Sequence, residues 1–356
     1  MMRIYVGTYS GQIGLLELSE AGEITSLRSV AGLEAPAFLG LHPNKHTLYA
    51  LSETRPGRVT AYTLEPTTGE LRLKNDQVLS GTYTCHLSVD PMGRMLFAAS
   101  YGSGHVHLLP LTPDGALLPE AACIHHEGHG ARPDRQEGPH AHCTVPHPQQ
   151  PYLFAADLGV DRVFVYRIDR QKVRLESHGQ VALPDGAGPR HIAIHPNGRF
   201  LYVINELNST VTGLLFDPEK GLLTAIHTQS TIPASHNGEN YPSEVALSPD
   251  GRFLYGANRG HNSLSVFQIE EATGRLLPRG HISVEGDWPR HFAISPDGRW
   301  LVVANQKSNN VVFFRLDQET GMPQSLNRQV ALPAPSCILF LSLESAGPAR
   351  LEGSSG

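Results

Sequence analysis

The feature that most constrains the fold of this 356-residue chain is a short phrase that recurs along it. Each copy has an apolar segment, a turn around proline, and a second apolar segment that ends on Asn, Ser or Asp. The clearest copies read RHIAIHPNGRFLYVIN, SEVALSPDGRFLYGAN and RHFAISPDGRWLVVAN, and three weaker copies precede them. The turn prolines are Pro43, Pro91, Pro148, Pro196, Pro249 and Pro296. Self-similarity at this spacing predicts a repeat architecture, in which equivalent positions can be compared within one chain.

Residues around each turn alternate between two faces with a period of two. In the clearest copy, Ile192, Ile194, Leu201 and Val203 share one side, a pattern that predicts strands and not helices. The Pro-Asn-Gly or Pro-Asp-Gly step supplies a preset φ, a capping side chain and a residue that tolerates positive φ. A third strand, such as STVTGLLF, and a fourth, such as LLTAI, follow each copy. Four antiparallel strands per repeat are typical of a β-propeller blade.

Both ends of the chain provide strands that the six copies leave over. The N-terminal RIYVGTYSG and IGLLELS lack a first strand, and the C-terminal SCILFL lacks a blade. Joined together, they complete a seventh blade and leave no strand edge of the ring unpaired. We therefore predict an all-β protein, a single seven-bladed propeller of four-stranded antiparallel blades over residues 1–342. Residues 343–356 have no periodicity, and we expect a disordered tail or an expression-tag remnant.

Composition restricts the partners and the compartment. Lys and Arg number 28 against 34 Asp and Glu, and the net charge of −6 provides no general attraction for nucleic acid or an anionic membrane. The apolar stretches have the length of strands, and no signal-peptide pattern is visible. The four cysteines of this long chain predict free thiols of a reducing compartment. We expect a cytoplasmic monomer or weak oligomer without a nucleic-acid or membrane partner.

Polar residues gather at the start of the first strand of each copy, which is the strand nearest the axis of a propeller. Six residues before the turn proline stand Ala37, Cys85, His142, Arg190, Ser243 and Arg290. Five residues before it stand Phe38, His86, Cys143, His191, Glu244 and His291. Because equivalent positions of a ring meet at one channel mouth, these titratable groups predict a binding or active site there.

Structural roles are open for the same residues. Each histidine can hydrogen-bond to the next blade, and Arg190 and Arg290 can form salt bridges between blades. Both arginines follow a proline, however, and a planar cation repeated at a channel mouth favours binding of carboxylate or phosphate. Glu206, at the end of a second strand, is either part of the site or a solvated loop residue.

The segment from Cys123 to His147 is unusually rich in histidine. Its histidines are His125, His126, His129, His140, His142 and His147. The HHEGH spacing is not the helical His-Glu-x-x-His pattern, and Gly128, Gly130 and Pro133 exclude a helix. We therefore favour a loop over the channel mouth that brings His140 and His142 to the site. We expect no cofactor and no metal site, although metal binding by this segment stays an open question.

Several quoted segments together resemble a known family. GPRHIAIHPNGRFLYVINELNSTV, SEVALSPDGRFLYGANRG, PHAH and YVGTYSG are similar to the lactonase family of seven-bladed propellers, and the resemblance extends over essentially the whole chain. That family includes propeller-type 6-phosphogluconolactonases and fungal carboxy-cis,cis-muconate cyclases. The active-site His, Arg and Glu proposed for the cyclases correspond to His142 of PHAH, Arg190 of GPRH and Glu206 of NEL. A second family arginine corresponds to Arg290.

The resemblance implies a hydrolase for a small, anionic, sugar-derived δ-lactone of the pentose phosphate type. Arg190 and Arg290 would bind the anionic end of the substrate or the developing carboxylate. His142 would act as general base or acid, with Glu206 orienting it or sharing the proton transfer. Which of His140 and His142 is the acid–base group stays open. The further expected substrate-binding residues are His86, His140, His191, Glu244 and His291.

Two other functions remain possible at this stage. A lactonising cyclase or isomerase acting on a dicarboxylate would use the same His, Arg and Glu. A non-enzymatic protein-binding platform would need an exposed aromatic or apolar face. The chain has only two tryptophans, and Trp300 lies within a predicted strand, which disfavours the platform.

Overall fold

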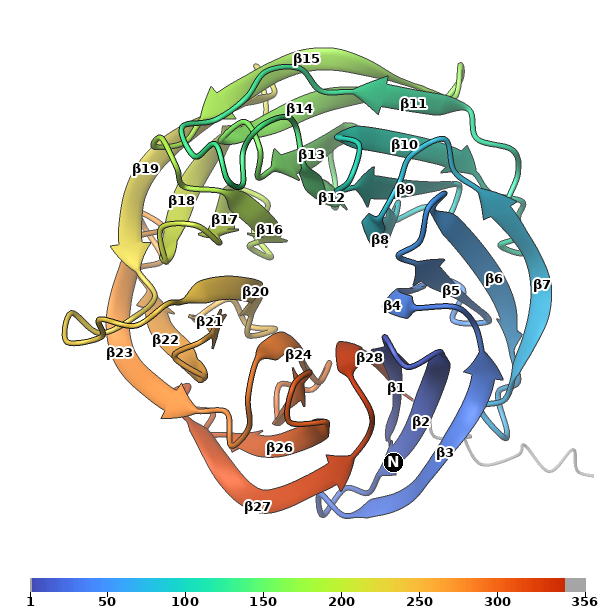
Figure 1. The fold of residues 1–356 in the computed structure, drawn as a ribbon, viewed down its shortest axis with the longest axis vertical. Helices are drawn as coiled ribbons and strands as arrows, with labels where there is room; N and C mark the ends of the chain where they lie inside the picture. The colour runs from blue at the N-terminus through green and yellow to red at the C-terminus, as the bar shows by residue number, and fades with distance from the viewer. Residues whose placement is uncertain (1, 343–356) are drawn as a thin grey trace, which may run out of the picture.

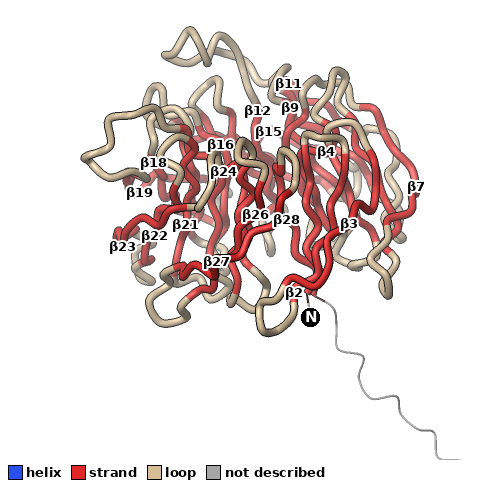
Figure 2. Tube along the Cα trace, turned by 60° about the horizontal axis from the view of Figure 1, so that its bottom comes forward, coloured by secondary structure: helices blue, strands red, loops and turns tan. Residues whose placement is uncertain are grey.

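The computed structural model describes residues 2–342, which form seven four-stranded antiparallel sheets around a common axis (Figure 1). This arrangement confirms the predicted all-β, seven-bladed propeller. Figure 2 shows strands running between two faces formed by loops, and the described residues contain no helix long and apolar enough to cross a membrane. The predicted tail, residues 343–356, lies outside the described residues, so the domain limit at residue 342 stays a prediction.

We number the blades along the chain and give the strands of each from the axis outward. Blade 1 consists of β28 (Pro335–Ser342), β1 (Met2–Thr8), β2 (Gln12–Leu18) and β3 (Ile24–Gly32). Blade 2 consists of β4 (Pro36–Leu41), β5 (Thr47–Ser52), β6 (Arg58–Leu64) and β7 (Leu71–Val78). Blade 3 consists of β8 (Thr84–Val89), β9 (Met95–Ser100), β10 (His105–Pro110) and β11 (Ala122–His125).

The remaining four blades follow the same order. Blade 4 consists of β12 (Ala141–Pro146), β13 (Tyr152–Asp157), β14 (Arg162–Asp169) and β15 (Arg174–Ala182). Blade 5 consists of β16 (Pro189–Ile194), β17 (Phe200–Asn205), β18 (Thr210–Asp217) and β19 (Leu222–Ser230). Blade 6 consists of β20 (Tyr241–Leu247), β21 (Phe253–Arg259), β22 (Ser263–Ile269) and β23 (Leu276–Ser283). Blade 7 consists of β24 (Pro289–Ile294), β25 (Trp300–Asn305), β26 (Asn310–Leu316) and β27 (Pro323–Ala331).

Blade 1 closes the ring as predicted, with strands from both ends of the chain. The last strand, β28, pairs antiparallel with β1, so that Ile4 lies opposite Phe340 and Val6 opposite Ile338. This pairing supplies the partner that the first and last segments of the sequence each lack.

The hydrophobic core is divided among the boundaries between blades. The described residues form seven apolar clusters, each shared by two neighbouring blades. Between blades 4 and 5, for example, Ile192, Leu201 and Val203 pack against Phe154, as the period-two pattern predicts. Because burial of apolar side chains occurs between the blades, the inner strands can present polar side chains to the axis.

Candidate active site

Every inner strand has a β-bulge at the same place near its start. In blade 5, Pro189 lies opposite Asn205 and His191 opposite Ile204, so Arg190 is an extra residue. The other six inner strands have the corresponding irregularity. Successive residues of a regular strand point to opposite faces, whereas a bulge re-aims a side chain. The bulge therefore explains why Arg190 and His191, although adjacent in sequence, both reach the channel.

Aromatic side chains from the position five residues before the turn proline meet across the channel. The ring of Phe38 lies 4.4 Å from that of His86 and 5.6 Å from that of His291, measured between ring centroids. His86 lies 5.1 Å from His191 in the same way. These rings form the floor of the site beneath the mouth.

Two of these floor histidines bridge neighbouring blades. His86 Nδ1 accepts a hydrogen bond from the backbone N–H of Thr144 at 3.3 Å, and His291 Nδ1 accepts one from Ile338 at 3.2 Å. Burial keeps the pKa of His86 well below its usual value and lowers that of His291 to about 4, so both are neutral at pH 7. The geometry thus supports the structural role considered for them, and their expected contact with substrate stays a prediction.

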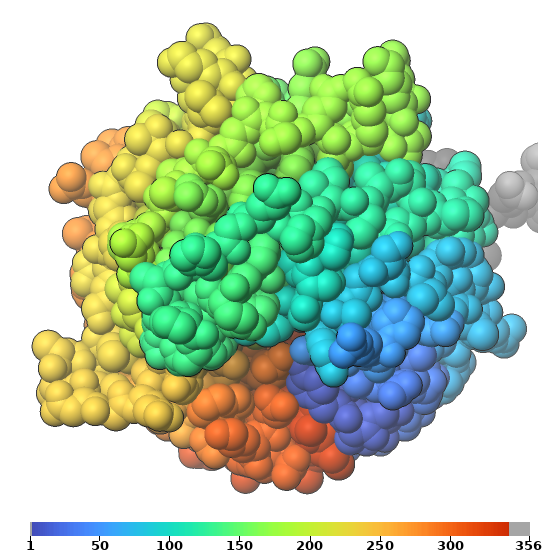
Figure 3. All heavy atoms as spheres, turned by 45° about the horizontal axis from the view of Figure 1, so that its top comes forward, coloured from blue at the N-terminus to red at the C-terminus, as the bar shows by residue number. Residues whose placement is uncertain are grey.

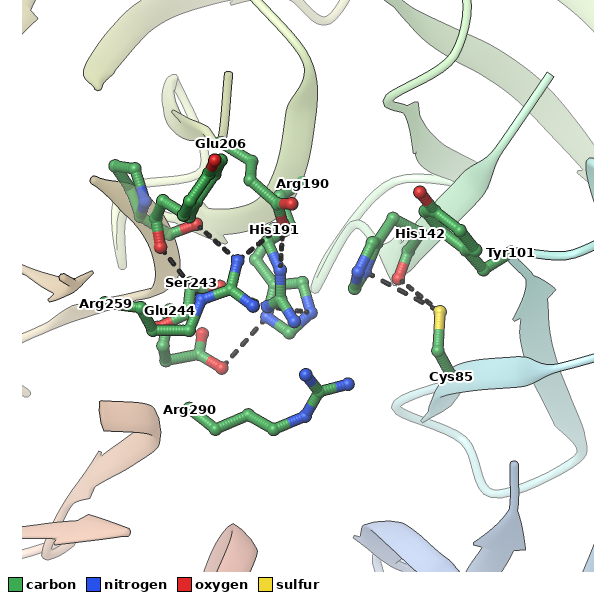
Figure 4. A network of polar contacts seen from close by, with 12 residues as sticks. Cys85, Tyr101, His142, Arg190, His191, Glu206, Ser243, Glu244, Arg259 and Arg290 are labelled. Carbon is green, nitrogen blue, oxygen red and sulfur yellow. Dashed lines mark hydrogen bonds and ion pairs between the residues drawn. The ribbon is translucent and has the colours of Figure 1, made fainter. Parts of the chain in front are cut away.

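Glu244 holds two of the histidines together. Its Oε2 lies 2.9 Å from His191 Nδ1 and 3.0 Å from His291 Nε2 (Figure 4). Arg190 Nη1 lies 3.2 Å from His191 Nε2, so that nitrogen accepts and Nδ1 carries the proton donated to Glu244. Burial raises the pKa of Glu244. The Glu244 carboxyl group thus joins two histidines of the floor. The expected contact of Glu244 and His191 with substrate stays a prediction.

Glu206 lies among three arginines. Its Oε2 accepts from Arg190 Nε at 3.0 Å and from Arg259 Nη2 at 2.7 Å, and its Oε1 accepts from Arg135 Nη2 at 2.6 Å (Figure 4). Burial would raise the pKa of Glu206, but the three guanidinium groups outweigh it and hold that pKa far below its usual value. Within the described part of the chain, the hydrogen bonds that the Glu206 carboxylate accepts all come from these arginines. The geometry therefore does not support the expectation that Glu206 orients His142.

Arg290 enters the mouth from blade 7. Its guanidinium donates to the Tyr9 hydroxyl, lies 4.8 Å from the centre of the Tyr9 ring and is 3.6 Å from Glu53 Oε2. The Tyr9 hydroxyl also hydrogen-bonds to Glu53. Arg290 is thus held by residues of blades 1 and 2 and faces the same space as Arg190.

A cavity of about 10 Å³ lies between the two arginines. That volume is close to the minimum that holds one water molecule. Its lining residues include Arg190, Arg290, Tyr9, Cys85 and His191. A larger ligand would therefore lie on the mouth above the floor, with a single water-sized space below it.

His142 and His140 have different surroundings. His142 Nδ1 lies 3.6 Å from Cys85 Sγ, and its ring lies 5.2 Å from that of His191. Burial, assisted by Arg190, keeps the pKa of His142 well below its usual value. Within residues 2–342 no hydrogen bond reaches its Nε2, so this neutral nitrogen is available to accept a proton. The ring of His140 stacks on that of Tyr101, and its Nδ1 lies 2.8 Å from the carbonyl oxygen of Tyr101. Because His140 is engaged in these contacts, the geometry favours His142 as the acid–base group.

The histidine-rich loop, residues 126–140, crosses from blade 3 towards blade 5. Arg132 Nη1 donates to the carbonyl of Leu207 at 3.3 Å, and Arg135 reaches Glu206. In Figure 3 the blue-green part of the chain, which includes this loop, extends across the middle of this face of the ring. The loop contributes Arg135 to the mouth, a residue that sequence analysis did not identify.

Sequence analysis also missed most of a third ring of residues. These residues follow the Asn, Ser or Thr near the end of the second strand in five of the blades, as Glu206 does after Asn205. The other four are Tyr9, Glu53, Tyr101 and Arg259. Comparing this position among the repeats would find them, just as comparing the positions before the turn proline finds the two inner rings.

The chain is similar to known proteins over almost its whole length. A family model described as "Lactonase, 7-bladed beta-propeller" matches residues 3–340. The 6-phosphogluconolactonase of Bacillus subtilis is 36% identical over 343 residues, which is 95% of this chain and 97% of that protein. The 6-phosphogluconolactonase of Pectobacterium carotovorum is 33% identical over 79% of this chain and 81% of its own length.

Solved structures show the same similarity in three dimensions. The periplasmic gluconolactonase of Pseudomonas aeruginosa has a TM-score of 0.91 and 33% identity, over 96% of this chain and 99% of its own. A protein from Lactobacillus plantarum has a TM-score of 0.89 and 31% identity, over 96% of this chain and all of its own (100%).

Proposed function

This chain belongs to the lactonase family of seven-bladed β-propellers, and from that premise we propose that it hydrolyses a sugar-derived δ-lactone, 6-phosphogluconolactone being the best candidate. Two named 6-phosphogluconolactonases among its relatives support this substrate. The observation that carries the proposal is the placement of Arg190 and Arg290 around one small polar cavity beside a neutral His142.

The arrangement provides the parts that ester hydrolysis needs. His142 Nε2 takes a proton from water as the water oxygen attacks the lactone carbonyl carbon. The guanidinium groups of Arg190 and Arg290 stabilise the negative charge that develops on the carbonyl oxygen. Cleavage of the bond between the carbonyl carbon and the ring oxygen then leaves an alkoxide, which receives the proton from His142. The products are a free hydroxyl group and a carboxylic acid, which ionises to a carboxylate and releases one proton to the solvent.

The charges of the mouth favour an anionic substrate. Its guanidinium groups belong to Arg135, Arg190, Arg259 and Arg290. The carboxylates that face them are those of Glu53 and Glu206. After burial itself, Arg190 is the main cause of the low pKa of His142. A bound anion offsets that positive charge, so substrate binding raises the basicity of His142 when it is needed.

The rim between blades 6 and 7 suits the sugar and its phosphate. The guanidinium of Arg259 lies 5.4 Å from the centre of the Trp288 ring, and Lys307 Nζ lies 3.3 Å from it. Trp288 has a φ of 67°, a strained value for a bulky residue, which places its ring at this rim. Lys307, which is exposed and lies over this ring, can bind the phosphate of a substrate held at the mouth.

The test is a proton-release assay corrected for spontaneous lactone hydrolysis. The protein should accelerate hydrolysis of 6-phosphogluconolactone, with a higher KM for unphosphorylated glucono-δ-lactone and no reaction with a carboxymuconate. Arg190→Gln should lower kcat/KM by about 100- to 1000-fold. Arg252→Gln, which changes an exposed arginine at the far end of blade 6, is the matched control and should be fully active. Equal activity of the two variants would contradict the proposed site.

A further inference from the structure

Side chains that can bind metal ions gather on blade 3, away from the mouth. His105 lies directly opposite His125 across β10 and β11, and His107 lies directly opposite Cys123. Directly opposed residues share a face of an antiparallel sheet, and so do residues two apart on one strand. The three histidines and the cysteine therefore project from one face of this strand pair.

Three donor atoms of different kinds converge there. The His107 imidazole, a carboxylate oxygen of Glu120 and the Cys123 sulfur provide ligand atoms that all lie within 4.8 Å of one another. Glu120 comes from the connection between β10 and β11. Nitrogen, oxygen and sulfur donors in this combination are those that Zn²⁺ accepts, and a three-residue set leaves a fourth position open.

The groups around these donors hold them in place. His107 Nε2 lies 2.7 Å from Ser100 Oγ, and Glu120 Oε2 accepts from Ser80 Oγ at 2.5 Å. These bonds occupy the outer atoms of both side chains. His107 Nδ1 and Glu120 Oε1 form a hydrogen bond with each other, and a metal ion would take the place of the proton that they share. Metal-binding histidines are usually oriented in this way by a second hydrogen bond at the other ring nitrogen.

The Ser100–His107–Glu120 chain also resembles a Ser–His–acid triad, but the surroundings of the serine exclude that role. Ser100 is fully buried, and its hydroxyl lies 2.7 Å from the hydroxyl of Thr84. A buried hydroxyl cannot reach a substrate, so the chain of hydrogen bonds orients His107.

Two further imidazoles lie beside these donors. The ring of His105 lies 4.8 Å from that of His125 and 6.0 Å from that of His107. Both belong to the same face of the strand pair but lie outside the group of three converging donor atoms.

We propose that His107, Glu120 and Cys123 bind one divalent transition-metal ion, with Zn²⁺ the best match, and that water completes the coordination. Sequence analysis favoured no metal site because it considered residues 123–147 as a unit. Two of the three proposed ligands precede that segment and join it only through the pairing of β10 with β11.

The position of the site suggests what the metal does. Strand β11 pairs with β10 over four residues only and leads directly into residues 126–140, which carry Arg135 to Glu206. A metal that joins Cys123 to His107 fixes this short outer strand and thereby the start of the loop over the mouth.

Cobalt provides the test, because a Co²⁺–thiolate bond has a charge-transfer absorption that nitrogen and oxygen ligands lack. Full-length reduced protein, stripped with EDTA and dialysed, is titrated with Co²⁺. We expect saturation at one Co²⁺ per chain, with the charge-transfer band and the visible bands of tetrahedral cobalt, and displacement by Zn²⁺. Cys123→Ser should remove the charge-transfer band without unfolding, because Cys123 is exposed. Glu120→Gln should weaken Co²⁺ binding.

The control variant is His129→Gln, which removes an exposed histidine of the following loop and should leave the spectrum unchanged. Absence of a saturable band in the unmodified protein would overturn the proposal. A band that persists in Cys123→Ser would do the same, as would binding lost only on replacing His261, which belongs to a histidine cluster on blade 6.

Discussion

The two ends of the inner strands use the same repeat in opposite ways. At the end away from the mouth, His42, His147 and His195 each stand directly before a turn proline. Each donates from Nε2 to the carbonyl of a glycine in the next blade's turn, at 2.8, 2.9 and 3.0 Å respectively. At the mouth, equivalent positions carry different residues with different partners, such as Cys85, His142, Arg190 and Arg290.

This difference separates structure from function within one chain. A residue type that makes the same bond in three blades stabilises the ring, because those three blade boundaries share one geometry. Positions that are equivalent in the backbone but differ in chemistry serve a ligand, because a ligand is not seven-fold symmetric. The proposed substrate would break the symmetry of the ring at the mouth alone.

The largest expected effect comes from a pair of histidines at the two ends of one strand, β12. His142→Gln should lower kcat/KM for lactone hydrolysis by about 10²- to 10⁴-fold, because it removes the proposed general base. Steady-state kinetics measure the loss, and thermal unfolding should show little change. If His147→Gln reduced kcat/KM as much as His142→Gln, the distinction between the two ends would fail.

The next effect concerns stability at the mouth. Glu206→Gln leaves the buried Arg190 and Arg259 and the partly exposed Arg135 without their shared counter-ion and should lower the free energy of unfolding by about 3–5 kcal/mol. Urea titration at neutral pH measures this loss.

The pH dependence of that loss identifies its cause. The pKa of Glu206 is held far below the ordinary 4.5, so its stabilisation is present above pH 4.5 and declines as pH falls towards the folded-state pKa. The stability difference between wild type and Glu206→Gln should therefore shrink on acidification below pH 4.5. A difference that stays constant over this range would show that the charge of Glu206 is not responsible.

The smallest expected effect lies at the far end. His147→Gln removes the bond to Gly198 and should cost about 1 kcal/mol in the free energy of unfolding, with kcat/KM unchanged. Parallel urea titrations and lactone assays measure both quantities. A marked fall in kcat/KM, in a variant whose free energy of unfolding falls by only about 1 kcal/mol, would indicate that this histidine has a role in the reaction.

The same distinction explains what could be predicted from the sequence. The turn phrase is local, so it predicted the blades, the closing strands and the two rings before the turn proline. The role of Glu206 could not be predicted, because its partners Arg135 and Arg259 come from an irregular loop and from another blade. The bulge at Arg190 is also invisible in the alternation of apolar residues, although it decides which way that side chain points.

The seam in blade 1 has a consequence for biosynthesis. Arg290 in blade 7 and Tyr9 in blade 1 are far apart in the sequence, yet their side chains are hydrogen-bonded across the boundary between blade 7 and the blade that holds this seam. A nascent chain that has not yet released β28 from the ribosome has His142, Arg190 and Arg290 but cannot complete the ring that aligns them. Catalytic competence should therefore appear abruptly, when the final strand docks, and a partly made chain would not act on metabolites during translation.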